Sequence, residues 1–75
     1  MKLNDNMIIH INNKRENQEL LEALKGLGVE GIRSYYKTYK EKTCYHVEGF
    51  YLYYSNIDYY KGCNAEIVEF KDIEL

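Results

Sequence analysis

The first third of the chain changes from a strand pattern to a helix pattern. Residues 7–12 read Met-Ile-Ile-His-Ile-Asn, which places apolar side chains on both faces of a strand and predicts a central position in a sheet. Beyond them Asn13 is a good helix N-cap, with Glu16 three residues later, and leucines then recur at the spacing of one helical face. Glycines at positions 26 and 28 can end the helix. The pattern predicts an amphipathic helix over residues 14–27.

From Ile32 onward the pattern has a period of two, which is typical of strands. Glu48-Gly49 is a tight hairpin signal, and Ser55 is placed to cap a short helix that Gly62 closes. The expected strands are residues 32–39, 43–47, 50–54 and 65–70. A polar turn is expected at 40–42 and a tail at 72–75.

These elements predict an α+β fold in a single small domain, residues 1–75, with the order β-α-β-β-β-(short α)-β. One amphipathic helix packs on a mostly antiparallel sheet, which gives two layers. A chain of this length buries a modest core, and small domains often depend on a partner subunit or on very good packing. A homodimer is therefore a reasonable expectation.

Charge and cysteine content restrict the class of protein. The formal net charge of −2 provides no general attraction to nucleic acid, although residues 33–42 hold four basic side chains against one acidic one. The two cysteines, Cys44 and Cys63, form no CxxC pair and are expected to be reduced thiols, with a bridge between them left open. Without an apolar run of membrane-spanning length or a signal-peptide pattern, we expect a cytoplasmic protein with no membrane contact.

Candidate chemistry is sparse. Cys44 and His46 would point the same way on a strand, but His10 and Cys63 lie far from them in sequence, so no metal site is expected. The glycines at 26, 28 and 31 spell G-x-G-x-x-G after a helix, whereas a dinucleotide site needs them after a strand. The acidic residues near the end of the chain are expected to be solvated charges that protect an edge strand, with nucleic-acid mimicry as the alternative. We expect no enzyme and no cofactor.

All nine tyrosines lie between Tyr35 and Tyr60. On a strand, Tyr35 and Tyr39 would share one face with Lys37, and Tyr51 would share one with Tyr53. Tyrosine and arginine are frequent interface anchors, which makes this set a candidate partner-binding surface. Its predicted members are Tyr35, Tyr39, Tyr51 and Tyr53, with Arg33 and Lys37 at the rim. The alternative is that one row of rings completes the core and the other only covers the sheet.

Several segments resemble small phage and prophage accessory proteins. These are the run Leu20-Leu21-Glu22-Ala23-Leu24-Lys25-Gly26, the aromatic-Lys turn Tyr59-Tyr60-Lys61, and the terminal stretch Ile67-Val68-Glu69-Phe70-Lys71-Asp72-Ile73. The sequence departs from the pattern at Cys63-Asn64-Ala65, where a Gly-Tyr pair is more usual. The resemblance implies a phage accessory origin and an α+β fold, and it brings no catalytic residues. Phage proteins of this size often bind and block a host protein, including immune nucleases.

Three functions follow as hypotheses. The leading one is a non-enzymatic phage or prophage protein that binds and inhibits a host protein, such as a component of antiviral defence, in the manner of an anti-CRISPR. The second is a nucleic-acid-binding module that uses the Tyr/Lys segment 33–42, where aromatic rings alternate with cations. The third is a homo-oligomer that sequesters a nucleotide signal between stacked tyrosines.

Overall fold

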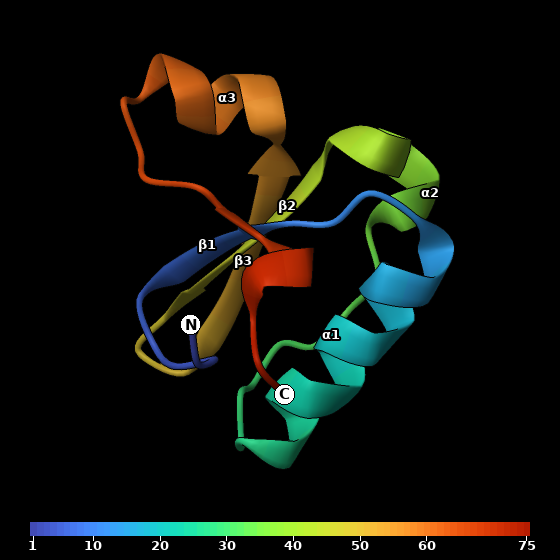
Figure 1. Ribbon diagram of the computed structural model, residues 1–75, viewed down its shortest axis with the longest axis vertical. Helices are drawn as coiled ribbons and strands as arrows, with labels where there is room; N and C mark the ends of the chain where they lie inside the picture. Colours follow the sequence, from blue (N-terminus) through green and yellow to red (C-terminus); the bar gives the residue numbers. More distant parts are fainter.

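The computed structural model covers residues 1–75 and shows a single small α+β domain, which confirms the predicted fold class (Figure 1). Its longest helix, α1, packs beside a four-stranded sheet, and α3 follows the end of β3 (Figure 1). In chain order the elements are β1 Met7–His10, α1 Lys14–Gly26, α2 Tyr36–Tyr39, the 3-10 helix η1 Lys40–Lys42, β2 Thr43–Glu48, β3 Tyr51–Asn56, α3 Ile57–Gly62, β4 Val68–Glu69 and the 3-10 helix η2 Phe70–Asp72.

The sheet has the strand order β3-β2-β1-β4. β1 is central, as its two apolar faces predict, and it pairs antiparallel with β2 through Ile9 opposite Tyr45. β2 pairs antiparallel with β3, with Tyr45 opposite Tyr54, whereas β4 lies parallel to β1. The sheet is therefore mixed, with two antiparallel pairings and one parallel pairing.

The predicted helix α1 forms with the N-terminal cap that the sequence indicates. The Glu16 backbone N–H donates to Asn13 Oδ1 at 2.8 Å, and the Glu16 carboxylate accepts from the Asn12 backbone N–H at 2.8 Å. These bonds satisfy backbone donors that a helix start leaves free. Leu20 and Leu24 are fully buried against the sheet. The core cluster contains Met7, Ile9, Ile11, Leu20, Leu24, Val29, Tyr45, Val47, Leu52, Phe70 and Ile73.

The strand predicted at residues 32–39 is absent, and that prediction was wrong. Glu30 pairs briefly with the outer edge of β3, through its N–H to Phe50 O at 2.8 Å and its carbonyl to Leu52 N at 2.9 Å. Gly31 then turns the chain at a φ of +75°, and Tyr36–Tyr39 form α2 with Tyr35 as its N-cap. Tyr35 and Tyr39 are four residues apart, a spacing that puts two side chains on the same side in a strand and in a helix alike.

Two further elements differ from their predicted bounds. The short helix begins after Asn56, whose side chain accepts from the Tyr59 backbone N–H at 2.9 Å, so Asn56 is the N-cap in place of Ser55. The last strand contains Val68 and Glu69 alone, because the chain turns into η2 at Phe70 to bury that ring. None of the helices has the length and apolar character needed to cross a membrane.

Candidate functional site

Strand alternation gives the sheet two different faces. On β2 and β3, Tyr45 and Leu52 point toward α1 and are buried in the core. Their strand neighbours His46, Tyr51 and Tyr53 consequently point to the opposite side, which we call the open face. The open face is the side of the sheet on which α1 does not pack.

Five aromatic rings form a continuous row on the open face. Neighbouring ring centres are 5.3 Å apart for Tyr51 and Tyr53, 6.0 Å for Tyr53 and His46, 6.0 Å for His46 and Tyr60, and 5.2 Å for Tyr60 and Tyr59. We call these residues the open-face row. Tyr51, Tyr53 and Tyr59 are 47%, 49% and 57% exposed, so three rings of the row present apolar surface to solvent. Tyr60 is buried, and burial raises the pKa of its hydroxyl to about 12.

The hairpin tip extends this surface with a strained phenylalanine. Gly49 and Phe50 both have positive φ, at 61° and 57°, as the tight turn between β2 and β3 requires. Glycine, asparagine and aspartate are the usual residues at such positions, and a bulky side chain there is a conformational outlier. Phe50 is nevertheless 51% exposed, so its ring gains little from core packing. Its backbone is fixed by an N–H bond to Asp5 Oδ1 at 3.0 Å.

Gly31 helps to set the position of Tyr51. A Cβ at Gly31 would lie 2.8 Å from Cζ of the Tyr51 ring, and the φ of Gly31 is +75°. Glycine is therefore required there both for the turn and for the close approach of the ring. Tyr51 lies against a backbone surface that a side chain would displace, which restricts the directions the ring can adopt.

A second group of aromatic residues lies on the α1 side of β3. The rings of Tyr35 and Tyr54 stack with centres 3.3 Å apart and planes 12° from parallel, and Tyr39 is 6.3 Å from Tyr54. Arg33 and Lys37 are exposed beside them in sequence. We call these five residues the basic tyrosine cluster. A hydrogen bond with the Tyr54 hydroxyl and burial both raise the pKa of Tyr35, and the Arg33 guanidinium opposes the rise, so the hydroxyl stays neutral at physiological pH.

The predicted partner-binding residues thus do not form a single outward row. Tyr51 and Tyr53 lie on the open face and are exposed, as predicted. Tyr35 and Tyr39 are half-buried in the basic tyrosine cluster, because residues 32–39 are not a strand. Arg33 and Lys37 are exposed beside that cluster, away from the open-face row.

Sequence reasoning missed five aromatic residues of these surfaces, namely His46, Phe50, Tyr54, Tyr59 and Tyr60. A signal for Phe50 was present in the sequence. The two-residue turn after Glu48 demands positive φ at both of its central positions, and a phenylalanine at the second one is out of place there. Tyr54 carried no such signal, since its stacking partner Tyr35 is distant in sequence.

A polar cluster around His10 joins three parts of the fold. His10 is buried, with Nδ1 2.9 Å from the Glu69 carboxylate and Nε2 2.6 Å from the Glu41 carbonyl oxygen. Asn12 Nδ2 also donates to Glu69 at 2.9 Å. Burial raises the pKa of Glu69, but the hydrogen bonds from Asn12 and His10 outweigh it, and the net pKa is lowered. Glu69 is therefore a paired side chain that attaches β4, and not the freely solvated charge that its sequence context predicts.

Both cysteines are free thiols, so the bridge that the sequence left open is absent. Cys44 is fully buried on β2, and burial raises its pKa to about 12, with a further rise from Glu69 and an opposing effect of Lys61. A thiol held protonated at neutral pH is a poor nucleophile. No group of three or more His, Cys, Asp or Glu side chains is close enough to hold a metal ion.

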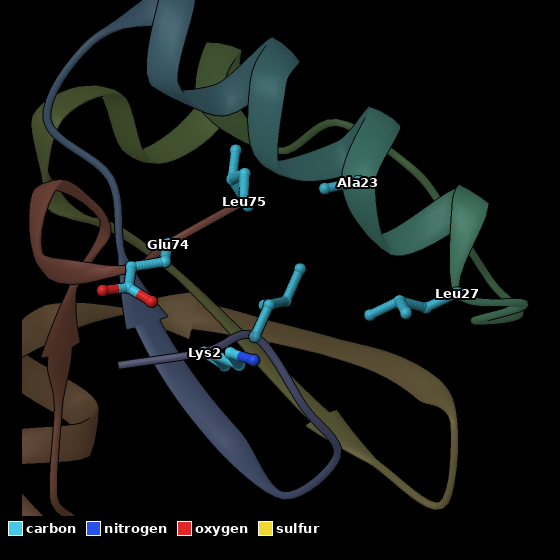
Figure 2. Close-up of a pocket in the computed structure, with 6 residues that line it drawn as sticks. Lys2, Ala23, Leu27, Glu74 and Leu75 are labelled. Atoms are coloured by element: carbon cyan, nitrogen blue, oxygen red, sulfur yellow. The ribbon is translucent and has the colours of Figure 1, made fainter.

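The largest hollow lies apart from the tyrosines. It is a cavity of about 450 Å³ between the last turns of α1 and the two chain ends. The side chains of Ala23, Leu27 and Leu75 line it together with the charged Lys2 and Glu74 (Figure 2). None of the predicted partner-binding residues contributes to it.

Comparison with known proteins found no family model that matches the chain, no similar curated protein and no similar solved structure. The resemblance to phage accessory proteins therefore stays a prediction.

Proposed function

We propose that this protein is a non-enzymatic binding protein that recognises another protein through the open-face row and Phe50. The observation that carries the proposal is the Phe50 backbone, which is held in a strained conformation while the ring stays half exposed. Strain of this kind costs on the order of 1–3 kcal/mol and concentrates at functional sites. An exposed ring at a strained turn is accounted for if the ring is used in binding.

The neighbouring rings support the same interpretation. Phe50, Tyr51, Tyr53 and Tyr59 are all close to half exposed or more. Contiguous exposed apolar surface on a small domain commonly marks an interaction site, and tyrosine is enriched among residues that dominate binding energy. The position of Tyr51 against Gly31 reduces the side-chain entropy that its ring would lose on binding.

The geometry of the rings favours a protein over a nucleobase as the partner. The open-face rings are tilted against one another, by 53° for Tyr51 and Tyr53 and by 46° for Tyr53 and His46. Tyr35 and Tyr54 are parallel, but they are already in direct contact at 3.3 Å. A base held between two rings would need a gap between parallel rings, and the only parallel pair, Tyr35 and Tyr54, is closed. The resemblance to phage accessory proteins makes a host protein, including one of antiviral defence, the partner class that we propose.

The test is capture of partners from a bacterial host lysate by immobilised protein, followed by mass spectrometry. We compare wild type with the double variant Tyr51→Ala/Tyr53→Ala and with Phe50→Gly. The matched control is Leu27→Ala, because Leu27 is 48% exposed and apolar but lies at the end of α1. We expect a defined set of host proteins retained by wild type and the control and depleted from both other samples. Equal capture by all four proteins would contradict the proposal.

A further inference from the structure

The basic tyrosine cluster holds hydrogen-bond donors and cations close together. The rings of Tyr35 and Tyr54 stack in parallel with centres 3.3 Å apart, and the Arg33 guanidinium lies near the Tyr35 hydroxyl, whose pKa it lowers. Each of the two tyrosine hydroxyls carries one proton that it can donate to an acceptor. Arginine adds several N–H donors in a planar arrangement that matches a carboxylate.

The positive charge of this region has no acidic partner within the protein. The four ion pairs of the structure involve His10, Arg15, Lys42 and His46, whereas Arg33, Lys37 and Lys40 are exposed and belong to none of them. Lys42, the other cation of this basic stretch, is 3.2 Å from Asp58. The charge of Lys42 is compensated, so the unpaired cations of residues 33–42 are Arg33, Lys37 and Lys40.

We propose that the basic tyrosine cluster binds side-chain carboxylates of an acidic segment in the partner protein. The inference rests on the proposed function and specifies the chemistry of the partner. Charge complementarity calls for an anionic occupant. Because Tyr35 and Tyr54 already stack on one another, no gap between their rings is open to a base, and the cluster offers hydroxyl and guanidinium donors around that stack. A carboxylate can accept hydrogen bonds from both the hydroxyl and the guanidinium groups, whereas a nucleic acid would also need unstacked rings for its bases.

The site adjoins the surface proposed for partner binding. Tyr53 and Tyr54 are consecutive on β3, so their side chains lie on opposite faces of the same edge strand. A partner that covers Tyr53 on the open face can reach Tyr54 by extending around this edge. The acidic segment would then add electrostatic selectivity to the apolar contacts of Phe50 and the open-face row.

The test is fluorescence anisotropy with a labelled twelve-residue peptide of alternating Glu and Gly, titrated with the purified protein at low salt. We compare wild type with Arg33→Gln/Lys37→Gln and with a control of the same charge change, Arg15→Gln/Lys25→Gln on α1. We expect the first double variant to weaken binding about tenfold or more, since charge-assisted hydrogen bonds are lost, and the control to change it less than about twofold. Tyr54→Phe keeps the ring stack and should weaken binding severalfold.

Three results would overturn the inference. They are absence of peptide binding, equal weakening by the two double variants, and preferential binding of a labelled oligothymidylate that depends on Arg33 and Lys37. Thermal unfolding of each variant establishes that it is folded, and Tyr54→Phe tests the site without changing its charge. Failure here leaves the capture experiment on Phe50 and the open-face row unaffected, so the two proposals fail separately.

Discussion

At the scale of single residues, the tyrosines differ by what their hydroxyl groups contact. Tyr45 is fully buried, and its hydroxyl donates to Asn17 Oδ1 of α1 and accepts from the Tyr35 backbone N–H at 2.9 Å. A buried hydroxyl of this kind needs such partners, because leaving it unpaired would cost about 1–3 kcal/mol. Tyr51, Tyr53 and Tyr59 have exposed rings and serve no comparable structural link. Tyr45 therefore links α1 to the sheet, whereas the rings of Tyr51, Tyr53 and Tyr59 are available for binding.

Phe50 gives the residue-scale prediction. Phe50→Ala and Phe50→Gly both remove the ring, but only glycine adopts a φ of +57° without steric cost. We therefore expect Phe50→Gly to be more stable than Phe50→Ala by about 1 kcal/mol, measured as the free energy of unfolding in urea. Both variants should lose partner capture to the same extent. Equal stabilities would show that the turn is not strained at this position.

The sequence was informative for individual residues where the signal is local. Asn13 and Glu16 cap α1 because both groups lie within one turn, and Leu20 and Leu24 are buried as their spacing predicts, whereas Leu27 at the helix end is exposed. Cys44 and His46 share a face because alternation is a property of any strand. The contact between Tyr35 and Tyr54 depends on how the chain returns to β3 after Gly31, which no local pattern specifies.

At the scale of elements, β4 is the least secured part of the sheet. It contributes only Val68 and Glu69, which pair with Ile9 and His10 of β1. Two backbone pairings are few, so side chains contribute much of its attachment. The predicted strand at 65–70 is longer than the observed one because Phe70 enters the core through η2, and hydrophobic alternation does not distinguish a buried strand residue from a buried turn residue.

We expect Glu69→Gln to loosen β4. Gln keeps the size of the side chain but removes the charge that accepts from His10 and Asn12, so we expect a loss of about 1–2 kcal/mol in unfolding free energy at pH 7. Hydrogen exchange should accelerate more at residues 68–73 than in α1. Unchanged exchange in this segment would contradict the role of Glu69.

The difference in unfolding free energy between wild type and Glu69→Gln should depend on pH, because the pKa of Glu69 is lowered in the folded protein. A carboxyl whose pKa is lower in the folded state contributes stability that is present above its unfolded pKa and is lost as pH falls through its folded pKa. The wild type should therefore lose its greater stability relative to Glu69→Gln as the pH decreases below about 4.5, the ordinary pKa of a glutamate side chain. Urea unfolding between pH 7 and pH 3 measures the difference. A constant difference over this range would mean that the charge of Glu69 is not involved.

At the scale of the whole molecule, the core is small relative to the aromatic surface. Only 16 of 75 residues are buried, while five large aromatic side chains, from Phe50 to Tyr59, are at least 42% exposed. Exposed apolar area is covered by association when a partner is present. In the absence of another partner, the open face of a second copy offers the same kind of surface, and the homodimer expected from the sequence stays a prediction.

We therefore predict weak self-association of the isolated protein through the open face. Sedimentation velocity should show a sedimentation coefficient that rises with protein concentration, and Tyr53→Ser/Tyr59→Ser should remove the rise. Because the exposed rings are uncharged, the association should persist at high salt, whereas binding of an acidic peptide at the basic tyrosine cluster should weaken as charges are screened. Arg33→Gln/Lys37→Gln is the matched control and should associate like wild type. A sedimentation coefficient that does not change with concentration, or an association that salt abolishes, would contradict the assignment of the open face as the apolar binding surface.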